Sequence, residues 1–400
     1  MDVVSATPAD VNLVVLYASP AASGGPEHVE VPVAYDALLL ASFGGPEGQD
    51  DVIPFLRNVT RGRGIPDERL EEVAHHYRHF GGISPINAQN RELKVKLEAE
   101  LARRGIDLPV YWGNRNWAPY LDEAVIAAEA AGHRTLLALA TSAYSSFSSC
   151  RQYREDFARV LDETGLGGTV TIDKIRQFFD HPGFVAPFVA GVRDAVAGFL
   201  ADGIAPGEIR VLFSTHSVPM DDARRSGPRD GEWGEGGAYE TQHLAVAAYV
   251  MAQIAEEIPD AADVPWQLVY QSRSGPPSQP WLEPDVCDVI EGLPAEGARA
   301  VAIVPLGFVS DHMEVLWDLD TEAMDAAAEA GLAAVRTPTP GVDPAYVAGL
   351  VDLIEERLKG TPTSERPHVT KLGPWFDVCR PGCCENIRAG FKPAASGIAP

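Results

Sequence analysis

The chain has 400 residues, 46% of them hydrophobic and 22% charged, and its 57 acidic and 32 basic residues give a formal net charge of −25. This length supports two domains of ordinary size, and the composition is that of a globular protein. The negative charge argues against nucleic acids and anionic lipid surfaces as partners, because binding to both depends on clustered Lys and Arg.

The N-terminal region does not have the pattern of a membrane or export signal. No apolar run approaches the roughly 18 residues needed to cross a bilayer, so we expect no stable membrane insertion. The early apolar stretch VNLVVLYASPAAS has no Lys or Arg before it, so the positive region of a signal peptide is missing. We interpret residues 1–34 as a variable extension of a cytoplasmic protein.

Strand-like apolar runs alternate with helical stretches from about residue 35 onward. In the first half, strands are expected at 36–45, 110–116 and 135–146, with helices at 67–79 and 121–131. In the second half, strands are expected at 169–178, 209–217, 266–275 and 300–310, with helices at 184–200, 241–257 and 285–291. This alternation predicts an α/β fold in which two doubly wound, Rossmann-like halves with parallel sheets face a central cleft.

The same pattern suggests domain boundaries. We place the first α/β domain at 35–150 and the second at 151–343, and we expect a helix at about 344–359 to pack back on the first domain. Residues 360–400 are interpreted as a linker and a cysteine-bearing tail. No glycine-rich phosphate-binding pattern follows any strand, which argues against a nucleotide site.

Two strand ends carry the residues best suited to chemistry. The segment LFSTHSVP places His216 at the end of a strand, and GFVSDHMEVLWDLD starts a helix with Glu314, Asp318 and Glu322 at four-residue intervals. Like charges at this spacing repel, so the row calls for a cation or a proton. Because an α-helix turns about 40° too far over every four residues, a local π-turn would align the three acids better.

On spacing alone, non-functional interpretations of both segments stay open. The acids could form a solvated helix face, and a lone histidine in this place is more often structural than catalytic. Neutral imidazole and carboxylates are nevertheless groups that bind a divalent metal and accept protons near neutral pH.

The five cysteines are unevenly distributed. Cys379, Cys383 and Cys384 lie within six residues of one another in the tail, Cys150 lies far upstream, and Cys287 is isolated in an expected helix. The three tail thiols and Cys150 together make up the number needed for a four-thiolate site. Four thiolates bind zinc or an iron-sulfur cluster. The paired Cys-x-x-Cys spacing of most zinc sites is absent, and Cys287 is expected to be an ordinary buried helix residue.

Several further segments, together with the two strand ends, resemble the ferrochelatases over roughly residues 36–359. They are SFGGPE at 42–47, FGGISPIN at 80–87, GNRNW at 113–117, SSCRQYRED at 148–156 and QSRSGPPSQPWLEPDV at 271–286. Ferrochelatases insert ferrous iron into a porphyrin. The GNRNW and SGPPSQPWLEPD stretches and the tail most resemble actinobacterial members, which use coproporphyrin III.

The resemblance implies specific site residues. His216 and Glu314 would be the catalytic pair that faces the substrate Fe²⁺, Asp318 and Glu322 the acidic path behind them, and Asp311 and His312 their orienting partners. Contacts with the porphyrin are implied for Phe43, Ser84 and Tyr153, and propionate pairing for Arg61, Arg63 and Arg115. Phe43 stands where some relatives have a tyrosine, so metal coordination from that side is in doubt.

The resemblance also implies partners and a cofactor. Some family members carry a 2Fe-2S cluster on one internal and three C-terminal cysteines, as Cys150, Cys379, Cys383 and Cys384 would provide. Coproporphyrin III would be the small-molecule partner, and enzymes of the haem pathway are candidate protein partners. The alternatives are a protoporphyrin IX ferrochelatase, a related chelatase that inserts cobalt into a cobalamin precursor, and a non-catalytic porphyrin or haem carrier with a redox-sensing cluster.

Overall fold

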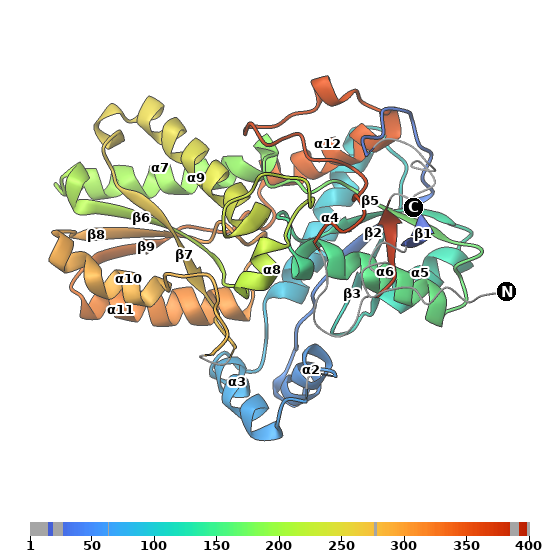
Figure 1. Ribbon diagram of the computed structural model, residues 1–400, viewed down its shortest axis with the longest axis horizontal. Coiled ribbons are helices and arrows are strands. Elements are labelled where there is room, and N and C mark those ends of the chain that lie inside the picture. Colours follow the sequence, from blue (N-terminus) through green and yellow to red (C-terminus); the bar gives the residue numbers. More distant parts are fainter. Residues whose placement is uncertain (1–14, 19–26, 63, 276–277, 385–391, 398–400) are drawn as a thin grey trace.

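The computed structural model describes residues 15–18, 27–62, 64–275, 278–384 and 392–397, and its main feature is a pair of four-stranded parallel sheets (Figure 1). The first has the order β3-β2-β4-β5, with β2 Ala37–Ser42, β3 Val110–Asn114, β4 Thr135–Ala140 and β5 Thr171–Lys174. The second has the order β7-β6-β8-β9, with β6 Ile209–His216, β7 Trp266–Gln271, β8 Ala300–Val304 and β9 Ala333–Arg336. These sheets confirm the predicted α/β fold.

Helices cover both faces of the second sheet. In Figure 1, α7 (Pro182–Ala201) and α9 (Gly237–Glu257) lie on one face, and α10 (Val286–Gly292) and α11 (Met324–Glu329) lie on the other. Every residue of β8, AVAIV, is consequently buried. A strand covered on both faces needs a continuous apolar run rather than an alternating one, which explains this sequence.

The first sheet is covered in the same way. Leu38 and Leu40 of β2 pack toward α4 (Ile86–Arg103), whereas Leu39 on the opposite face packs toward α5 (Leu121–Ala130) and α6 (Gln152–Glu163). The C-terminal helix α12, Pro344–Lys359, packs against both α4 and α7. The largest hydrophobic core therefore extends through both halves of the molecule.

The strand pairing corrects the domain boundary expected after residue 150. Strand β5 was assigned to the second domain, but it pairs in parallel with β4 in the first sheet. Helix α6 also packs on that sheet. The first half therefore extends to at least residue 174. The apolar pattern of 169–178 indicates a strand, but it carries no information on which sheet the strand joins.

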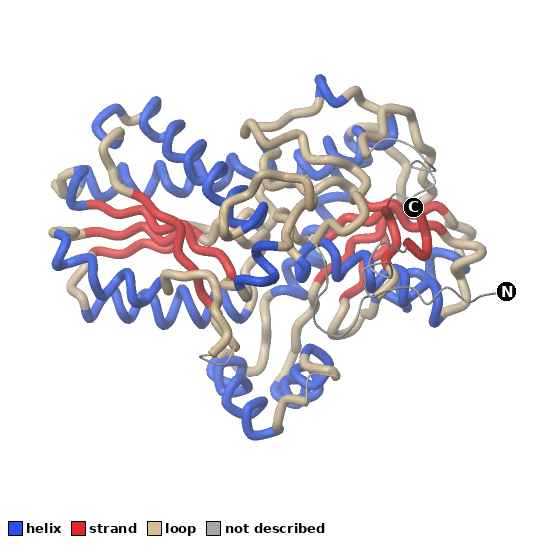
Figure 2. The backbone as a smooth tube through the Cα atoms, in the orientation of Figure 1, coloured by secondary structure: helices blue, strands red, loops and turns tan. Residues whose placement is uncertain are grey.

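Two further parts extend from the sheets. Helices α2 (Val52–Val59) and α3 (Asp67–His79) form a lobe with its own small core, which projects from the body in Figures 1 and 2. Helix α7 is long and apolar enough to cross a membrane by length and composition, but half of that stretch is buried, and it packs against α9 and α12. The short helix α8 spans Met220–Arg224, and β1 (Val15–Ala18) pairs with β10 (Ala394–Gly397).

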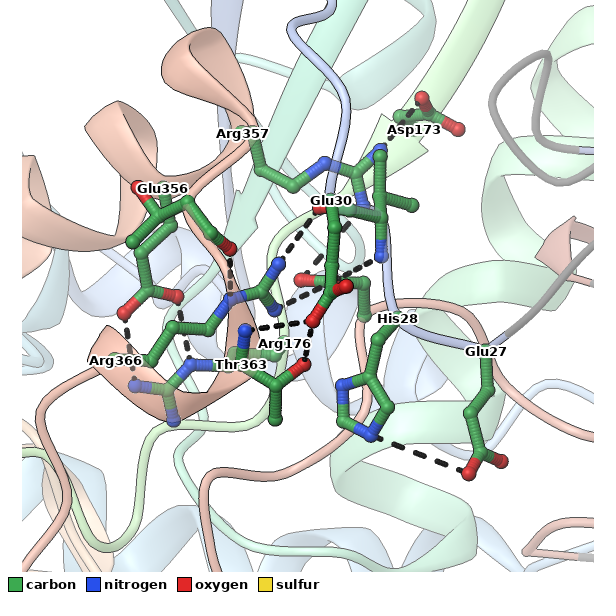
Figure 3. Close-up of polar contacts among 12 residues, drawn as sticks. Glu27, His28, Glu30, Asp173, Arg176, Glu356, Arg357, Thr363 and Arg366 are labelled. Carbon is green, nitrogen blue, oxygen red and sulfur yellow. Dashed lines mark hydrogen bonds and ion pairs between the residues drawn. The ribbon is translucent and has the colours of Figure 1, made fainter.

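A buried set of ion pairs attaches the tail to the body (Figure 3). Within the tail, Arg366 donates to Asp377 at 2.6 Å, and outside it Arg366 donates to the carbonyl of Val29 at 2.7 Å. Arg357 of the body donates to Asp173 at 2.9 Å and lies 3.9 Å from Asp377 Oδ1 of the tail. All four of these charged side chains are at most 1% exposed. Residues 27–34, which the sequence analysis places in the variable extension, contribute to this anchor, because Val29 hydrogen-bonds both Asp377 and Arg366. The rest of that extension, 1–14 and 19–26, lies outside the described residues.

Candidate active site

A cleft of about 790 Å³ lies between the two halves, at the carboxyl ends of their strands. The first half contributes Phe43, after β2, and the segment from Thr141 to Tyr153, after β4. The second half contributes His216, from the end of β6, and Glu314. Open α/β sheets bind their ligands at this edge, because the strand ends bring polar residues from separate loops together.

His216 and Glu314 face each other in this cleft. The His216 Nε2 atom lies 3.6 Å from Glu314 Oε1, and the Nδ1 atom donates to the carbonyl of Ser217. Glu314 is also oriented by His312, whose Nδ1 accepts from the Glu314 backbone N–H at 3.2 Å. The structure thus brings together the two residues expected to face the metal and one of their expected orienting partners. The other, Asp311, contacts Arg336 and Thr339 instead.

The pair is strongly polarised. Burial opposes charge on both groups, but their mutual attraction outweighs it, so the pKa of His216 is raised to about 9 and the pKa of Glu314 is lowered to about 2. With Nδ1 donating to a carbonyl, Nε2 is the atom that exchanges its proton toward Glu314 and the cleft. The site can therefore hold a proton or a cation between these two side chains.

The acidic row lies on a π-helix, as predicted. Residues Val315–Ala323 form this helix, with Glu314 at its N-cap, and it carries Asp318 and Glu322 toward the same cleft. π-Helices are rare and concentrate at functional sites. Here the wider turn lets side chains four apart share one wall.

Asp318 is the acid whose charge is least compensated. Burial and the neighbouring Glu314 carboxylate raise the pKa of Asp318 to about 7, although a hydrogen bond from Ser272 opposes the shift. A carboxyl group with this pKa can accept and release a proton near neutral pH. Glu322, by contrast, is exposed, and it accepts from Trp317 Nε1 at 2.8 Å.

Trp317 was not singled out by the sequence analysis. Its indole stacks on the imidazole of His76, with ring centroids 4.1 Å apart and planes inclined by 6°. His76 belongs to α3 in the projecting lobe, so the contact joins the lobe to the π-helix across the cleft. No sequence spacing signals such a contact, because the partners are 241 positions apart and belong to different halves.

Four of the residues expected to contact the porphyrin lie in the cleft. Phe43, Ser84, Arg115 and Tyr153 all line the cleft. Arg115 lies over the Tyr153 ring at 4.8 Å and pairs with Asp156 at 2.6 Å, so its guanidinium is held in place.

Another expected propionate partner, Arg61, does not line the cleft. Arg61 is exposed, donates to Asn58 at 2.7 Å, and is not among the residues that line the cleft. This position argues against its expected propionate contact. Arg63 lies outside the described residues. Arg69 and Arg273 line the cleft instead, and Arg273 stands within the QSRSGPPSQPWLEPDV segment that carried the resemblance.

The four clustered thiols lie close together beneath the cleft wall. Cys150 Sγ is 3.8 Å from Cys379 Sγ, Cys383 Sγ is 3.8 Å from Cys384 Sγ, and all four side chains are buried. Hydrogen bonds among neighbouring thiols lower the pKa of Cys379 and Cys384 and raise that of the other two. Cys287 is only partly buried in α10 and lines the cleft near the acidic row.

The surroundings of the thiols fit a negatively charged group. Arg151, Arg154 and Lys174 are buried beside them, and the Gly227 backbone N–H donates to Cys384 Sγ at 3.3 Å. Two thiolates on one tetrahedral metal would lie about 3.8 Å apart, given bonds of about 2.3 Å. Among the described residues, however, no three His, Cys, Asp or Glu side chains are already arranged to hold a metal ion.

Comparison with known proteins decides the family. The profile of the family described as ferrochelatase matches residues 35–358. The chain belongs to the ferrochelatase family. A protein named coproporphyrin III ferrochelatase from Leifsonia xyli subsp. xyli is 66% identical over 393 residues, which cover 96% of this chain and 100% of the relative. Proteins of the same name from Tropheryma whipplei (strain Twist) and Streptomyces griseus subsp. griseus are 58% and 53% identical, over 92% of this chain and 93% and 97% of their own.

The solved structures add little to this ferrochelatase assignment. A structure described as CbiX, the terminal enzyme for biosynthesis of siroheme in denitrifying bacteria, aligns with a TM-score of 0.44 and 14% identity, over 81% of this chain and 100% of that one. The family assignment rests on sequence, and the fold rests on the structure itself.

Proposed function

We propose that this ferrochelatase-family protein inserts Fe²⁺ into coproporphyrin III and releases the two pyrrole protons. The observation that carries the proposal is the His216–Glu314 pair at the head of an acidic π-helix, inside a cleft of about 790 Å³. Metal insertion needs a group that accepts and releases Fe²⁺, acceptors for two protons, and walls that hold the ring. The cleft offers all three.

The residues divide these tasks by position. His216 and Glu314 face each other closely enough to hold a proton between imidazole and carboxylate, and once that proton leaves they can hold the incoming Fe²⁺ in its place. Asp318, four residues further along the π-helix, has a pKa of about 7 and is suited to take a proton onward. Glu322 is exposed and connects the row with solvent.

Coproporphyrin III is the preferred substrate on two grounds. Proteins of this name are the relatives described above, and the substrate carries four propionates. Three guanidinium groups line the cleft, those of Arg69, Arg115 and Arg273, and such groups bind carboxylates in a two-pronged way. Phe43 lies on the same wall and offers a ring face but no oxygen for the metal.

The test is anaerobic Fe²⁺ insertion by the purified protein, followed by absorption spectroscopy with coproporphyrin III and protoporphyrin IX in parallel. We expect faster turnover of coproporphyrin III. A preference for protoporphyrin IX would overturn the assignment of coproporphyrin III as substrate but would leave the proposed iron insertion intact. Binding of both porphyrins without turnover would identify a carrier and overturn the proposed activity.

We further propose that Cys150, Cys379, Cys383 and Cys384 hold a 2Fe-2S cluster. The cluster would supply a redox-active, cross-linking group, and iron insertion itself requires no electron transfer, so we assign it a structural or regulatory function. Its support is the burial of four adjacent sulfurs among three cations. Iron and acid-labile sulfide analysis with electron paramagnetic resonance tests it: Cys150→Ser should abolish the signal, and Cys287→Ser, the matched control, should retain it.

The setting of the activity is also a proposal. We expect the protein to act in the cytoplasm, with haem-pathway enzymes that supply its porphyrin and receive its product. Fractionation of cells that express the full chain tests the location. Recovery of the protein in the membrane fraction after a high-salt wash would contradict it.

A further inference from the structure

Two residues at the end of β7, Gln271 and Ser272, join the parts of the active site and have no assigned task. Gln271 is 1% exposed and lies directly beside His216 in the register of the parallel sheet. Its backbone carbonyl accepts from Ser217 N–H at 2.8 Å. The strand that presents His216 and the strand that ends in Gln271 are therefore fixed relative to each other up to their last residues.

The side-chain amide of Gln271 connects this strand with the π-helix. Ser214 Oγ donates to Gln271 Oε1 at 2.7 Å, which directs the Nε2 group the other way. Nε2 then donates to the backbone carbonyl of Glu314 at 3.0 Å and to Asp318 Oδ2 at 3.2 Å. One buried amide thus holds the start of the π-helix and its second acid.

Ser272 adds a second hydrogen bond to the same carboxylate oxygen. Its hydroxyl donates to Asp318 Oδ2. Its backbone has φ of 62°, in the left-handed region that residues with a Cβ rarely adopt. A serine retained in this conformation is typical of functional sites, where the surrounding structure enforces it.

Both hydrogen bonds end on one oxygen of Asp318. Among the described residues, the hydrogen bonds to this side chain all reach Oδ2, so Oδ1 accepts none of them, and Asp318 lines the cleft. We propose that Gln271 and Ser272 are positioning residues that hold Asp318 with Oδ1 toward the reacting porphyrin nitrogens and fix the π-helix beside His216. This inference deepens the proposed iron insertion and rests on it.

The hydroxyl of Ser272 can be removed without straining the backbone. Ser272→Gly adopts a positive φ freely and has no donor, and we expect it to lower kcat about tenfold, the usual size for loss of a hydrogen bond to a charged group. The Kd for coproporphyrin III should change less than about twofold, because the lost donor serves Asp318 rather than the ring. Ser278→Gly, on the same loop and outside the cleft lining, is the matched control and should behave as the unsubstituted chain.

Rescue and coupling separate positioning from a general structural effect. Ser272→Asn tolerates the left-handed conformation and restores a donor, so it should regain most of the lost kcat. In an Asp318→Asn background, Ser272→Gly should have almost no further effect, because its partner carboxylate is already gone. Gln271→Met removes the amide at similar length and gives an independent measurement with the same expected pattern.

The outcomes distinguish this inference from the proposed function. If the unsubstituted chain does not insert iron, the proposed function fails. If it does, unchanged kcat in both Ser272→Gly and Gln271→Met overturns the positioning role. An equal loss with and without the Asp318 carboxylate overturns it as well. Should Ser272→Gly not fold, the Gln271→Met result in the two backgrounds decides between these outcomes.

Discussion

The tail junction and the active-site cleft both bring charged side chains close together, but they compensate the charges in opposite ways. At the junction, Asp377 pairs with Arg366, Asp173 pairs with Arg357, and Glu356 receives two hydrogen bonds from Arg176. In the cleft, the ion pairs of the acidic row involve only histidines among the described residues.

The difference shows what each region is built to do. A buried carboxylate paired with a guanidinium stays ionised and fixed, which suits an anchor. In the cleft, by contrast, Asp318 has a pKa of about 7, and the partner of Glu314 is a titratable imidazole rather than a guanidinium. We infer that ionisable groups without a permanent partner can exchange protons, at a cost in stability.

The largest expected effect comes from breaking the anchor. Arg366→Leu leaves Asp377 buried without its 2.6 Å partner and should lower the free energy of unfolding by about 3 to 5 kcal/mol. Chemical denaturation monitored by circular dichroism measures the change. Arg159→Ala is the control, because Arg159 forms an exposed pair with Glu163, and its loss should cost less than about 1 kcal/mol. Equal effects of both changes would contradict the comparison.

Arginines inside and outside the cleft should differ in porphyrin binding. We expect Arg115→Ala to weaken coproporphyrin III binding about tenfold, because it removes from the cleft wall a guanidinium that Asp156 holds in place. Arg61→Ala should change the Kd less than about twofold, because Arg61 is exposed outside that wall. Fluorescence titration compares the two variants, and a larger effect at Arg61 would restore the sequence-based expectation.

The smallest expected effect is a gain in stability from removing an uncompensated acid. The pKa of Asp318 is raised from 3.8 to about 7 in the folded protein, so its contribution to stability is fully present below about pH 4 and is lost as pH rises through 7. Asp318→Asn abolishes this loss. Its Tm at pH 8 should exceed that of the unsubstituted protein by about 2 °C, and the difference should shrink at pH 5. A lower Tm at pH 8 would show that Asp318 is structurally compensated.

The sequence was sufficient for much of this account. The apolar runs predicted seven of the eight strands of the two sheets, all but β9. The four-residue spacing of Glu314, Asp318 and Glu322 predicted the π-helix, because the mismatch with an α-helix is a local property. His216 and Glu314 were singled out by the resemblance of their segments to the ferrochelatases, because spacing alone left structural interpretations of both residues open.

Features that depend on tertiary placement could not be predicted. The membership of β5 in the first sheet, the stack of His76 on Trp317, and the hydrogen bonds of Gln271 each join segments distant in the chain. The same holds for Arg61, which follows the cleft-lining residues Val59 and Thr60 but is itself exposed and is not among the residues that line the cleft. Spacing gives local geometry, and only packing decides which surfaces meet.

The most direct test of the central claim is to remove the His216–Glu314 pair and measure binding and turnover separately. His216→Ala and Glu314→Gln should each lower anaerobic Fe²⁺ insertion into coproporphyrin III at least about 100-fold, while the Kd for the porphyrin changes little. Turnover retained in either variant, with folding intact, would contradict the claim that the acids and imidazole of the cleft carry out metal insertion.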